Sequence, residues 1–543
     1  MDNQTRSLWI IEAPGKIKCV SHALEALGYH DATVIATGGH FKKMPPTLMA
    51  SGISTDFEDF LRVPKPYAME KLMAGIAAMG NDGQIYIATD ADTEGHVIAT
   101  DIVDAIRHLP LKMPLRVLLR ALDKDSIENA IADAAPVLRE DATAGRTRAI
   151  IDRLIGAGLF AFNRGHGLGA GRIKAAILGI VAYDPPPLEY FSLVAPPLAG
   201  GRDWHVRHAV SGPFDPVQVA RLVEMKLPPL KEASRTDARP MPDDMGRALI
   251  RGGDEINLSP KEAAIAMQSA YESGLLSYPR SDARGLSRDA ASRLAVAFQQ
   301  TGQRFDKALI PDRLSSDVHD SPWPVGAASP SNHPQSLGPI EGMRAILARN
   351  LLRSGQRCIE GRHLPGALYA FLIENGFSED FSKAVDALPW ARDIGPRQHG
   401  APAKSATYSR RADTALLESC VRAGIGRPST YAEHIDNLLS RGFVDDRLRL
   451  TESGQALLEG TPAIMLSPEF SRDIEAACKV KPQMHDLGLR YEAWQVRAME
   501  MADDMPEPIK SMIFAVLTSP QKTQSASMDG GVFSQGLQNR RHA

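Results

Sequence analysis

The chain has 543 residues, with a hydrophobic content of 43% and a charged content of 23%, which is typical of a soluble globular protein of several domains. Its 62 Lys and Arg against 65 Asp and Glu give a formal charge of −3, so any nucleic-acid surface must come from local segregation of charge. The four cysteines form no C-x-x-C pair, which argues against a cysteine zinc module and fits a reducing compartment. No run approaches the roughly 20 apolar residues of a membrane span, and no signal pattern opens the chain. We therefore expect a cytoplasmic protein without a membrane partner.

The first quarter of the chain alternates between predicted strands and predicted helices. The predicted strands cover residues 8–11, 33–36, 85–88 and 115–119, and the helices cover residues 17–27 and 69–79, a stretch after Gly95 and one opened by Asp123 or Asp125. This alternation predicts a parallel sheet. In such sheets functional residues gather outside the carboxyl ends of the strands. Glu12 ends one predicted strand and Asp90 ends another, so we expect them to share a site.

Three acids follow the predicted strand at 85–88 at alternate positions. In extended backbone the side chains of Asp90, Asp92 and Glu94 would point the same way. Three carboxylates that close repel one another unless a cation lies among them or one of them holds a proton. Mg²⁺ favours such oxygen ligands. A solvated acidic turn is the alternative, and Lys16 either reaches an anionic group at this edge or forms a helix pair with Glu12.

A basic amphipathic helix is predicted for residues 146–162, where Arg148, Asp152 and Arg153 alternate with apolar positions. A glycine-rich turn follows and opens a second helix at 173–181. Free N–H groups at such a turn can hold a phosphate, and Arg172 would add positive charge there. A flexible connection is the alternative reading.

Residues 184–258 are rich in Pro and Gly and contain predicted strands at 191–195 and 204–210, so this segment is predicted to be mostly β. Ser259 and Glu262 have the spacing of a capping box that opens a helix. Beyond that helix Pro279 disfavours helical backbone at Tyr278, which places the phenol on a loop two residues from Arg280. A nucleophile and a phosphate binder are thus close in sequence, although an ordinary surface tyrosine would give the same pattern.

The last part of the chain is less informative. Residues 300–340 have a loop composition and include His333, which alone is more often structural than catalytic. Thr430 and Glu433 have the spacing of a second capping box, and residues 442–450 suggest a hairpin after that helix, an order found in winged-helix units. The helical signal weakens after residue 506, and residues 519–543 have the composition of a flexible tail.

Five separated segments, in the same order, resemble the motifs of the type IA DNA topoisomerases. Residues 8–16 resemble the first strand of the Toprim domain, and residues 90–95 resemble its acidic motif. Residues 152–156 with 170–172 resemble the DNA-binding helices that follow, residues 277–282 the nucleophile loop, and residues 424–431 the G-x-G-R-P-S-T-Y segment. The chain departs from the family at Thr93, where the acidic motif usually has Arg, and at His96, where an acid is common. It has no C-terminal zinc modules.

The resemblance implies a fold of the class α/β plus α and β, a multidomain toroid with a parallel α/β Toprim domain at its N-terminus. The implied segments are a Toprim domain at 1–137, a helical DNA-binding domain at 138–187 and 406–508, a β hinge domain at 188–257 and 353–405, an arch domain with the nucleophile at 258–352, and a flexible tail at 509–543.

The resemblance also implies an ATP-independent isomerase that cuts one DNA strand through a 5′-phosphotyrosine, passes a strand and rejoins the ends. Relaxation of negative supercoils and decatenation are both implied. Tyr278 would attack, Arg280 and Lys16 would balance phosphate charge, Glu12 would exchange a proton with the 3′ oxygen, and His333 would complete the catalytic group. Mg²⁺ would be held by Glu12, Asp90, Asp92 and Glu94. The implied DNA contacts are Arg148, Arg153, Arg172, Arg427, Ser429 and Thr430.

The implied partners are single-stranded and negatively supercoiled DNA, bound by a monomer. Two other readings remain open. A Toprim nuclease or primase-like protein would use the same acids without Tyr278. A weakly active relative would keep the fold as a DNA-binding module.

Overall fold

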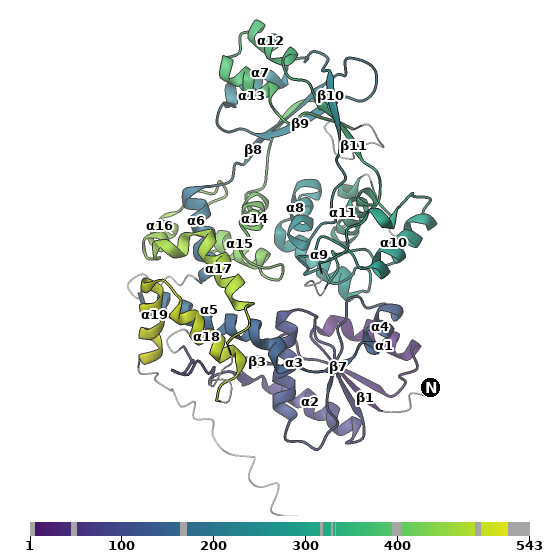
Figure 1. Cartoon of the computed structure of the whole chain (residues 1–543), viewed down its shortest axis with the longest axis vertical. Helices are drawn as coiled ribbons and strands as arrows, with labels where there is room; N and C mark the ends of the chain where they lie inside the picture. The colour runs from purple at the N-terminus through teal and green to yellow at the C-terminus, as the bar shows by residue number, and fades with distance from the viewer. Residues whose placement is uncertain are drawn as a thin grey trace, which may run out of the picture.

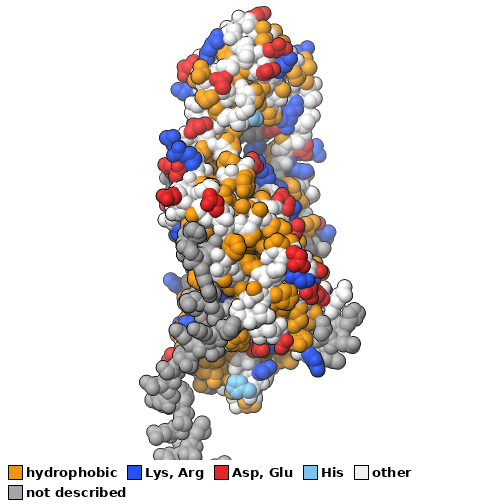
Figure 2. All heavy atoms as spheres, turned by 90° about the vertical axis from the view of Figure 1, so that its left-hand side faces the viewer, with side chains coloured by type: hydrophobic (Ala, Val, Ile, Leu, Met, Phe, Trp, Pro, Cys, Tyr) orange, Lys and Arg blue, Asp and Glu red, His pale blue; other side chains and the backbone are white. Residues whose placement is uncertain are grey.

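The computed structural model describes residues 6–44, 51–162, 171–314, 319–326, 329–331, 333–393, 404–483 and 490–519. The molecule is elongated, with an N-terminal α/β domain at one end, a six-stranded sheet at the other and helices between them (Figure 1). Seen from the side, acidic and basic side chains are interspersed on the face that is turned to the viewer (Figure 2). This mixture agrees with the near-neutral composition of the chain.

The N-terminal domain is built on a sheet with strand order β2-β1-β5-β6-β7. Strand β1 (Ser7–Ile11) is buried along its whole length and pairs in parallel with β2 (Ala32–Ala36) and β5 (Gln84–Ile87). Strand β6 (Leu115–Arg116) continues the parallel sheet, and β7 (Ala135–Pro136) closes it as an antiparallel edge. The predicted parallel sheet is confirmed, since a central strand covered on both faces explains the continuous apolar run.

Helices cover both faces of this sheet. Alternate residues of β1 face opposite ways, so that Trp9 packs with α1 (Ile17–Ala26) and α4 (Lys124–Ala132), whereas Leu8 packs with α2 (Pro66–Met79) and α3 (Thr93–Ile106). A small antiparallel ribbon of β3 (Lys42–Lys43) and β4 (Val63–Pro64) precedes α2.

The middle of the molecule is a helical body with one large apolar core. Its helices come from distant parts of the chain and are α5 (Thr143–Phe162), α6 (Arg172–Tyr183), α8 (Met245–Ile256), α9 (Pro260–Glu272), α11 (Pro339–Ser354), α14 (Ala412–Ala423), α15 (Tyr431–Ser440), α16 (Glu452–Glu459), α17 (Pro468–Cys478), α18 (Ala493–Asp503) and α19 (Glu507–Thr518). Helix α10 (Arg288–Gln300) packs in a separate cluster beside α11, around Phe298 and Trp323. The 3₁₀ turns are η1 (Pro14–Lys16), η2 (Arg139–Ala142), η3 (Lys307–Leu309), η4 (Pro334–Ser336) and η5 (Ala463–Leu466).

The distal sheet is antiparallel, with strand order β10-β11-β12-β9-β8-β13. Its strands are β8 (Glu189–Ala195), β9 (Trp204–Ala209), β10 (Glu232–Asp237), β11 (Ile359–His363), β12 (Ala391–Asp393) and β13 (Ala406–Ser409). Helices α7 (Pro216–Val223), α12 (Ala367–Glu374) and α13 (Glu379–Asp386) cover it around a core that includes Trp204 and Trp390. The predicted β segment is thus confirmed, and its strands come from three separated stretches.

The structure corrects several local predictions. The capping box of Ser259 and Glu262 is present. The hydroxyl of Thr430 instead donates to the carbonyl oxygen of Arg427 at 3.4 Å and accepts no hydrogen bond from the first turn of α15, so the second predicted capping box is absent. The predicted hairpin at 442–450 contains a single bridge between Val444 and Leu450. A tail that begins at 509 is wrong as well, since α19 buries Ile509, Ile513 and Leu517 against the helical body.

Four elements lie on the other side of the predicted domain boundaries. Helices α9 and α11, which belong to the predicted arch domain, share the apolar core of the helical body. Helix α8 packs in the helical body rather than with the distal sheet, and β13 lies in the distal sheet rather than in the helical body. The division into domains otherwise stays a prediction. Most of the glycine-rich turn before Arg172 and residues 520–543 of the predicted tail lie outside the described residues.

Candidate active site

The carboxyl edge of the N-terminal sheet brings Glu12 and Lys16 next to the acidic motif. Glu12 follows β1 directly, and η1 carries Lys16 back over the sheet edge. The ammonium of Lys16 is buried, forms an ion pair with Asp90 and lies 4.6 Å from the centroid of the Tyr271 ring. The expectation that Lys16 reaches an anionic group at this edge is therefore met by Asp90.

The acidic loop is fixed by local backbone contacts. Asp92 caps α3, because its Oδ1 accepts from the N–H of Gly95 at 2.8 Å. Gly95 has no room for a side chain, since a Cβ there would lie 1.7 Å from the carbonyl oxygen of Asp90. Beneath the loop the buried guanidinium of Arg116 donates to the carbonyls of Thr89 and Asp90 at 2.7 and 2.6 Å. Arg116 was not predicted as a functional residue, yet it positions the loop.

Tyr278 reaches this edge from the loop after α9. Its hydroxyl donates to Asp92 Oδ2 at 2.6 Å, and its backbone N–H donates to the carbonyl of Arg120 at 2.9 Å. The side chain is 1% exposed. His319 stacks on the phenol ring, with centroids 4.1 Å apart and an interplanar angle of 26°. The phenol is therefore held between an acid of the first domain and an imidazole of its own domain.

The electrostatics of the site follow from burial and from crowded acids. Burial, together with the charges of Asp90 and Asp92, raises the pKa of Glu12 to about 7. Burial and the same two carboxylates also raise the pKa of Tyr278 well above its ordinary value. Burial lowers the pKa of His319 to about 3, so this imidazole stays neutral near pH 7. The site thus holds a protonated phenol, a neutral imidazole and a carboxyl group that titrates near neutrality.

Arg280 is the open cation of the site. Burial lowers its pKa, but the charges of Tyr278, Asp90, Glu12 and Asp92 together outweigh that effect and raise it. Among the described residues no carboxylate or carbonyl forms an ion pair or hydrogen bond with its guanidinium. Arg280 is therefore available to an anionic ligand beside the phenol.

Glu94 faces a different set of partners from the other two acids of its motif. It forms ion pairs with Arg148, with Arg427 at 3.7 Å and with His40 at 3.0 Å. Arg427 also donates to the hydroxyl of Thr93 at 2.8 Å, so a guanidinium from the helical body stands beside the position where the family motif usually has Arg. The structure therefore brings Glu12, Asp90 and Asp92 together and turns Glu94 toward the helical body.

The chemistry of these acids fits a divalent cation. Burial first, and then the charges of Asp90 and Asp92, raise the pKa of Glu12 to about 7, and a bound cation would relieve the part that comes from charge repulsion. Within the part of the chain that the structure describes, no three His, Cys, Asp or Glu side chains are already arranged around one point. The convergence of Asp90, Asp92 and Glu94 on one ion therefore stays a prediction.

The predicted DNA contacts lie in different environments. Arg148 and Arg427 both form ion pairs with Glu475. The Nε–H of Arg153 donates to the carbonyl of Ser51 at 2.9 Å. Arg172 is buried, with a side chain 1% exposed, and bonds to Asp152 and Ser471. In this conformation Arg172 is not open to a phosphate. Ser429 and Thr430 are half-buried next to Arg427.

The structure does not bring His333 to the catalytic group. His333 is exposed at the start of η4, and its backbone N–H donates to the hydroxyl of Ser331 at 3.1 Å. The histidine beside the phenol is His319, which sequence reasoning missed. Its signal in the sequence was weak, since a histidine within a loop-like stretch has no periodicity to mark it.

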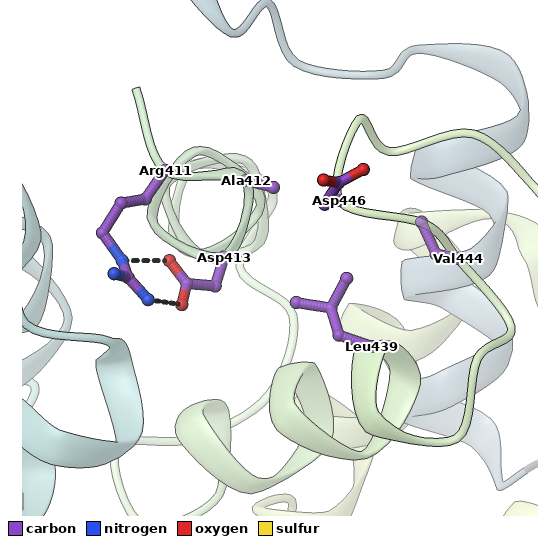
Figure 3. Close-up of a pocket in the computed structure, with 6 residues that line it drawn as sticks. All are labelled: Arg411, Ala412, Asp413, Leu439, Val444 and Asp446. Atoms are coloured by element: carbon purple, nitrogen blue, oxygen red, sulfur yellow. Dashed lines mark hydrogen bonds and ion pairs between the residues drawn. The ribbon is translucent and has the colours of Figure 1, made fainter. Parts of the chain in front are cut away.

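A cavity of about 340 Å³ lies elsewhere, in the helical body (Figure 3). It is lined by Arg411, Ala412, Asp413, Leu439, Val444 and Asp446. The guanidinium of Arg411 is paired with the carboxylate of Asp413 on its rim. None of the predicted site residues lines it. Tyr278 is 1% exposed, so the phenol is closed off from solvent in this conformation.

Comparison with known proteins supports this arrangement of domains. A family model described as "Toprim domain" matches residues 7–118. DNA topoisomerase 1 of Campylobacter jejuni is 24% identical over 87% of this chain and 75% of its own length. A plasmid DNA topoisomerase I of Xylella fastidiosa is 24% identical over 86% of this chain and 79% of its own length. For DNA topoisomerase 1 of Escherichia coli, at 21% identity, the match spans 81% of this chain and 59% of that protein.

The fold comparison covers nearly the whole chain. The structure of full-length topoisomerase I from Thermotoga maritima matches with a TM-score of 0.61 and 18% identity, over 94% of this chain and 90% of that one. Among the described helices none is long and apolar enough to cross a bilayer. With its N-terminal Toprim domain and this multidomain architecture, the chain has the fold of the type IA DNA topoisomerases.

Proposed function

We propose that this protein is a type IA DNA topoisomerase that cuts and rejoins one DNA strand through Tyr278. The observation that carries the proposal is the contact of Tyr278 Oη with Asp92 Oδ2 at 2.6 Å, because it joins a buried phenol to the acidic edge of a Toprim domain. A phenol between a carboxylate, a neutral imidazole and an open guanidinium has the surroundings of a nucleophile.

In this proposal Tyr278 Oη attacks the phosphorus of a phosphodiester, and the bond to the 3′ oxygen breaks. The phenol proton is directed at Asp92, which is the acceptor already within hydrogen-bond distance. Glu12, with a pKa of about 7, is partly protonated near neutrality and supplies the proton that the leaving 3′ oxygen needs. The reverse steps rejoin the strand, so the exchange of one phosphodiester for another requires no ATP.

The cations of the site stabilise negative charge on the phosphate. Arg280 has no partner among the described residues and can donate two parallel hydrogen bonds to phosphate oxygens. Lys16, paired with Asp90, keeps net charge at the sheet edge low. Glu12, Asp90 and Asp92 would hold Mg²⁺ together with Glu94 if its ion pairs with the helical body release it. The metal, when bound, supplies positive charge that orients the broken end for rejoining.

The substrate in this proposal is single-stranded DNA within a negatively supercoiled or catenated molecule, bound by a monomer. Our proposed backbone contacts remain two arginines of α5, Arg148 and Arg153, and three residues of the segment just before α15, Arg427, Ser429 and Thr430. Arg148 and Arg427 lie next to Glu94. Arg172 is set apart from them, because its guanidinium already bonds to protein groups.

The decisive experiment is a covalent adduct assay with Mg²⁺ and single-stranded oligonucleotides labelled at either end. If Tyr278 joins the 5′ phosphate, denaturing gels show the 3′-labelled strand attached to protein and the 5′-labelled strand as a shorter free fragment. Tyr278→Phe should abolish both products. Tyr271→Phe is the matched control. Tyr271 is equally buried, its ring lies 5.5 Å from that of Tyr278, and among the described residues its hydroxyl makes only a long contact of 3.5 Å to a carbonyl.

The same assay separates the two alternatives. Cleavage that survives in Tyr278→Phe, with no protein attached, would identify a Toprim nuclease. Binding without any adduct in the unaltered protein would indicate a DNA-binding relative with little or no chemistry.

A further inference from the structure

Three lysines of the Toprim domain lie together outside the group described above. Lys43 belongs to the ribbon strand β3, Lys65 is the residue just before α2, and Lys71 lies in the second turn of α2. In the ribbon Lys43 is opposite Val63, and strand alternation places Lys65 on the same face as Val63. Lys42 points the other way, toward Asp101 at 3.8 Å. Lys43 and Lys71 are exposed and Lys65 is half-buried, and the three together form one group, which we call the lysine platform.

Tyr67 holds this platform in place. The ammonium groups of Lys65 and Lys71 lie 5.7 and 5.6 Å from the centroid of the Tyr67 ring, within the range of a cation–π contact. The hydroxyl of Tyr67 donates to the carbonyl of Thr37 at 2.6 Å, and the ammonium of Lys65 donates to the carbonyl of Gly38 at 2.9 Å. Lys65 is thus anchored directly to the turn after β2, and Lys71 is held beside it through the Tyr67 ring.

That turn connects the platform to the catalytic edge. The backbone N–H of Gly38 donates to the carbonyl of Glu12 at 2.9 Å. Gly38 has a φ of +65°, and a Cβ there would lie 2.1 Å from the hydroxyl of Tyr67, so the turn requires glycine. Burial lowers the pKa of Lys65, with Lys43 acting in the same direction and Glu12 opposing them, which shows that all three groups lie near one another. The platform therefore stands one turn away from Glu12.

The surroundings of the platform leave its charge uncompensated. In the described part of the chain, no carboxylate forms an ion pair with any of the three lysines. The first turn of α2 contains no acid, and the helix contributes the positive end of its dipole there. Glu70, in the second turn, is the acid nearest in sequence on this helix, and it is exposed. The protein has a net charge of −3, so a phosphate-binding surface requires positive charge gathered in one place, and the three lysines provide it.

We propose that Lys43, Lys65 and Lys71 bind phosphates of the single-stranded DNA that extends from the Glu12 side of the cleavage site. This inference rests on the proposed function, since it takes the strand at Glu12 to be DNA. It adds a contact surface on the Toprim domain to the arginines of the helical body. Lysines read phosphate as point charges without regard to base, so the platform increases affinity and not sequence preference.

The size of the effect follows from counterion release. Each phosphate contact contributes about 0.7 to the salt slope of single-strand binding, so three contacts contribute about 2. Between 50 and 200 mM salt, a slope of about 2 corresponds to a loss of affinity of roughly 20-fold. The full-length triple variant Lys43→Gln, Lys65→Gln, Lys71→Gln should lack this part of the salt dependence.

The experiment is fluorescence anisotropy with a labelled oligonucleotide, long enough to extend beyond the cleavage site, in EDTA so that every sample is free of divalent cations. The matched control is the triple variant Lys18→Gln, Lys112→Gln, Lys124→Gln, which removes the same charge from other exposed positions of the same domain. We expect the slope to fall by about 2 in the platform variant and to stay unchanged in the control. Glu70→Gln should raise affinity.

An unchanged slope in the platform variant, or an equal fall in the control, would overturn the inference. The pair Lys43→Gln, Lys71→Gln leaves the Lys65 anchor intact and should lower the slope by about 1.4, which guards against a folding defect. The adduct assay at saturating oligonucleotide tests the chemistry separately. A fall in slope without any adduct in the unaltered protein would support the platform and refute the proposed chemistry.

Discussion

Replacing Arg172 with Ala tests whether this arginine serves the fold or the DNA. Its guanidinium donates to Asp152 at 2.7 and 3.2 Å and to the carbonyl and hydroxyl of Ser471 at 2.7 and 3.0 Å, and it lies 3.4 Å from Glu475. Burial lowers its pKa, but the charge and hydrogen bond of Asp152 and the charge of Glu475 outweigh burial and raise it. The guanidinium is thus bonded to protein groups and does not face a DNA phosphate in this conformation.

The expected loss of stability in Arg172→Ala follows from the partner groups that the substitution leaves unpaired. Removing one partner of a buried ion pair costs about 3–5 kcal/mol. The lower end applies here, because Asp152 is 37% exposed and can be solvated, and Glu475 keeps its contacts with Arg148 and Arg427. The carbonyl of Ser471 loses a buried donor, which costs a further amount of about 1 kcal/mol. We therefore expect a loss of about 3–4 kcal/mol in the free energy of unfolding of the helical body.

Urea unfolding, followed by tryptophan fluorescence, measures this loss. Arg441→Ala is the control, since Arg441 is an exposed arginine of the same body and should change stability by no more than about 0.5 kcal/mol. Native Arg172→Ala protein should bind single-stranded DNA with an unchanged salt slope. A stability within about 1 kcal/mol of the unaltered protein, together with a slope reduced by about 0.7, would refute the structural role.

Three further predictions concern the catalytic edge. Gly95→Ala should lower adduct formation about 100-fold in a folded protein, because its methyl group would clash with the carbonyl of Asp90 and displace the acidic loop, and near-normal adduct yield would contradict this. Arg293→Gln removes a hydrogen bond of 2.7 Å from α10 to Asp123 at the start of α4. The amide hydrogens of the Tyr278 loop should then exchange faster than in the unaltered protein, whereas those of the helical body should not. Unchanged exchange in the Tyr278 loop would rule out a role for this interdomain contact. Glu12 has a folded pKa of about 7, above its ordinary value of 4.5, so its protonated form favours folding. In metal-free buffer the melting temperature should therefore fall between about pH 4.5 and 7 more in the unaltered protein than in Glu12→Gln, and parallel curves would refute the raised pKa.

The sheet and its acidic edge could be predicted because they depend on local patterns. Continuous apolar runs mark strands that are covered on both faces, and a site at the carboxyl ends follows from parallel topology. Tyr278 was predictable for a similar reason, since Pro279 excludes helix and Arg280 follows it. These features depend on residues that are close to one another in the sequence.

The rest of the site depends on contacts between distant segments, which a single sequence does not display. His319 stacks on Tyr278 from a loop 41 positions later in the sequence. Glu94 forms ion pairs with Arg148 and Arg427 of the helical body, which turn its side chain away from the other acids. Arg172 has the sequence context of a phosphate ligand but is buried by α17. In each case tertiary packing decided between roles that the residue type alone left open.

The backbone bond from the N–H of Tyr278 to the carbonyl of Arg120 has a practical consequence. It is independent of the side chain at position 278, so a chemically silent Phe variant keeps its loop docked on the first domain. Such a protein would present an intact substrate strand to an assembled but inert cleft, which makes it the form in which to trap the uncut complex for crystallography.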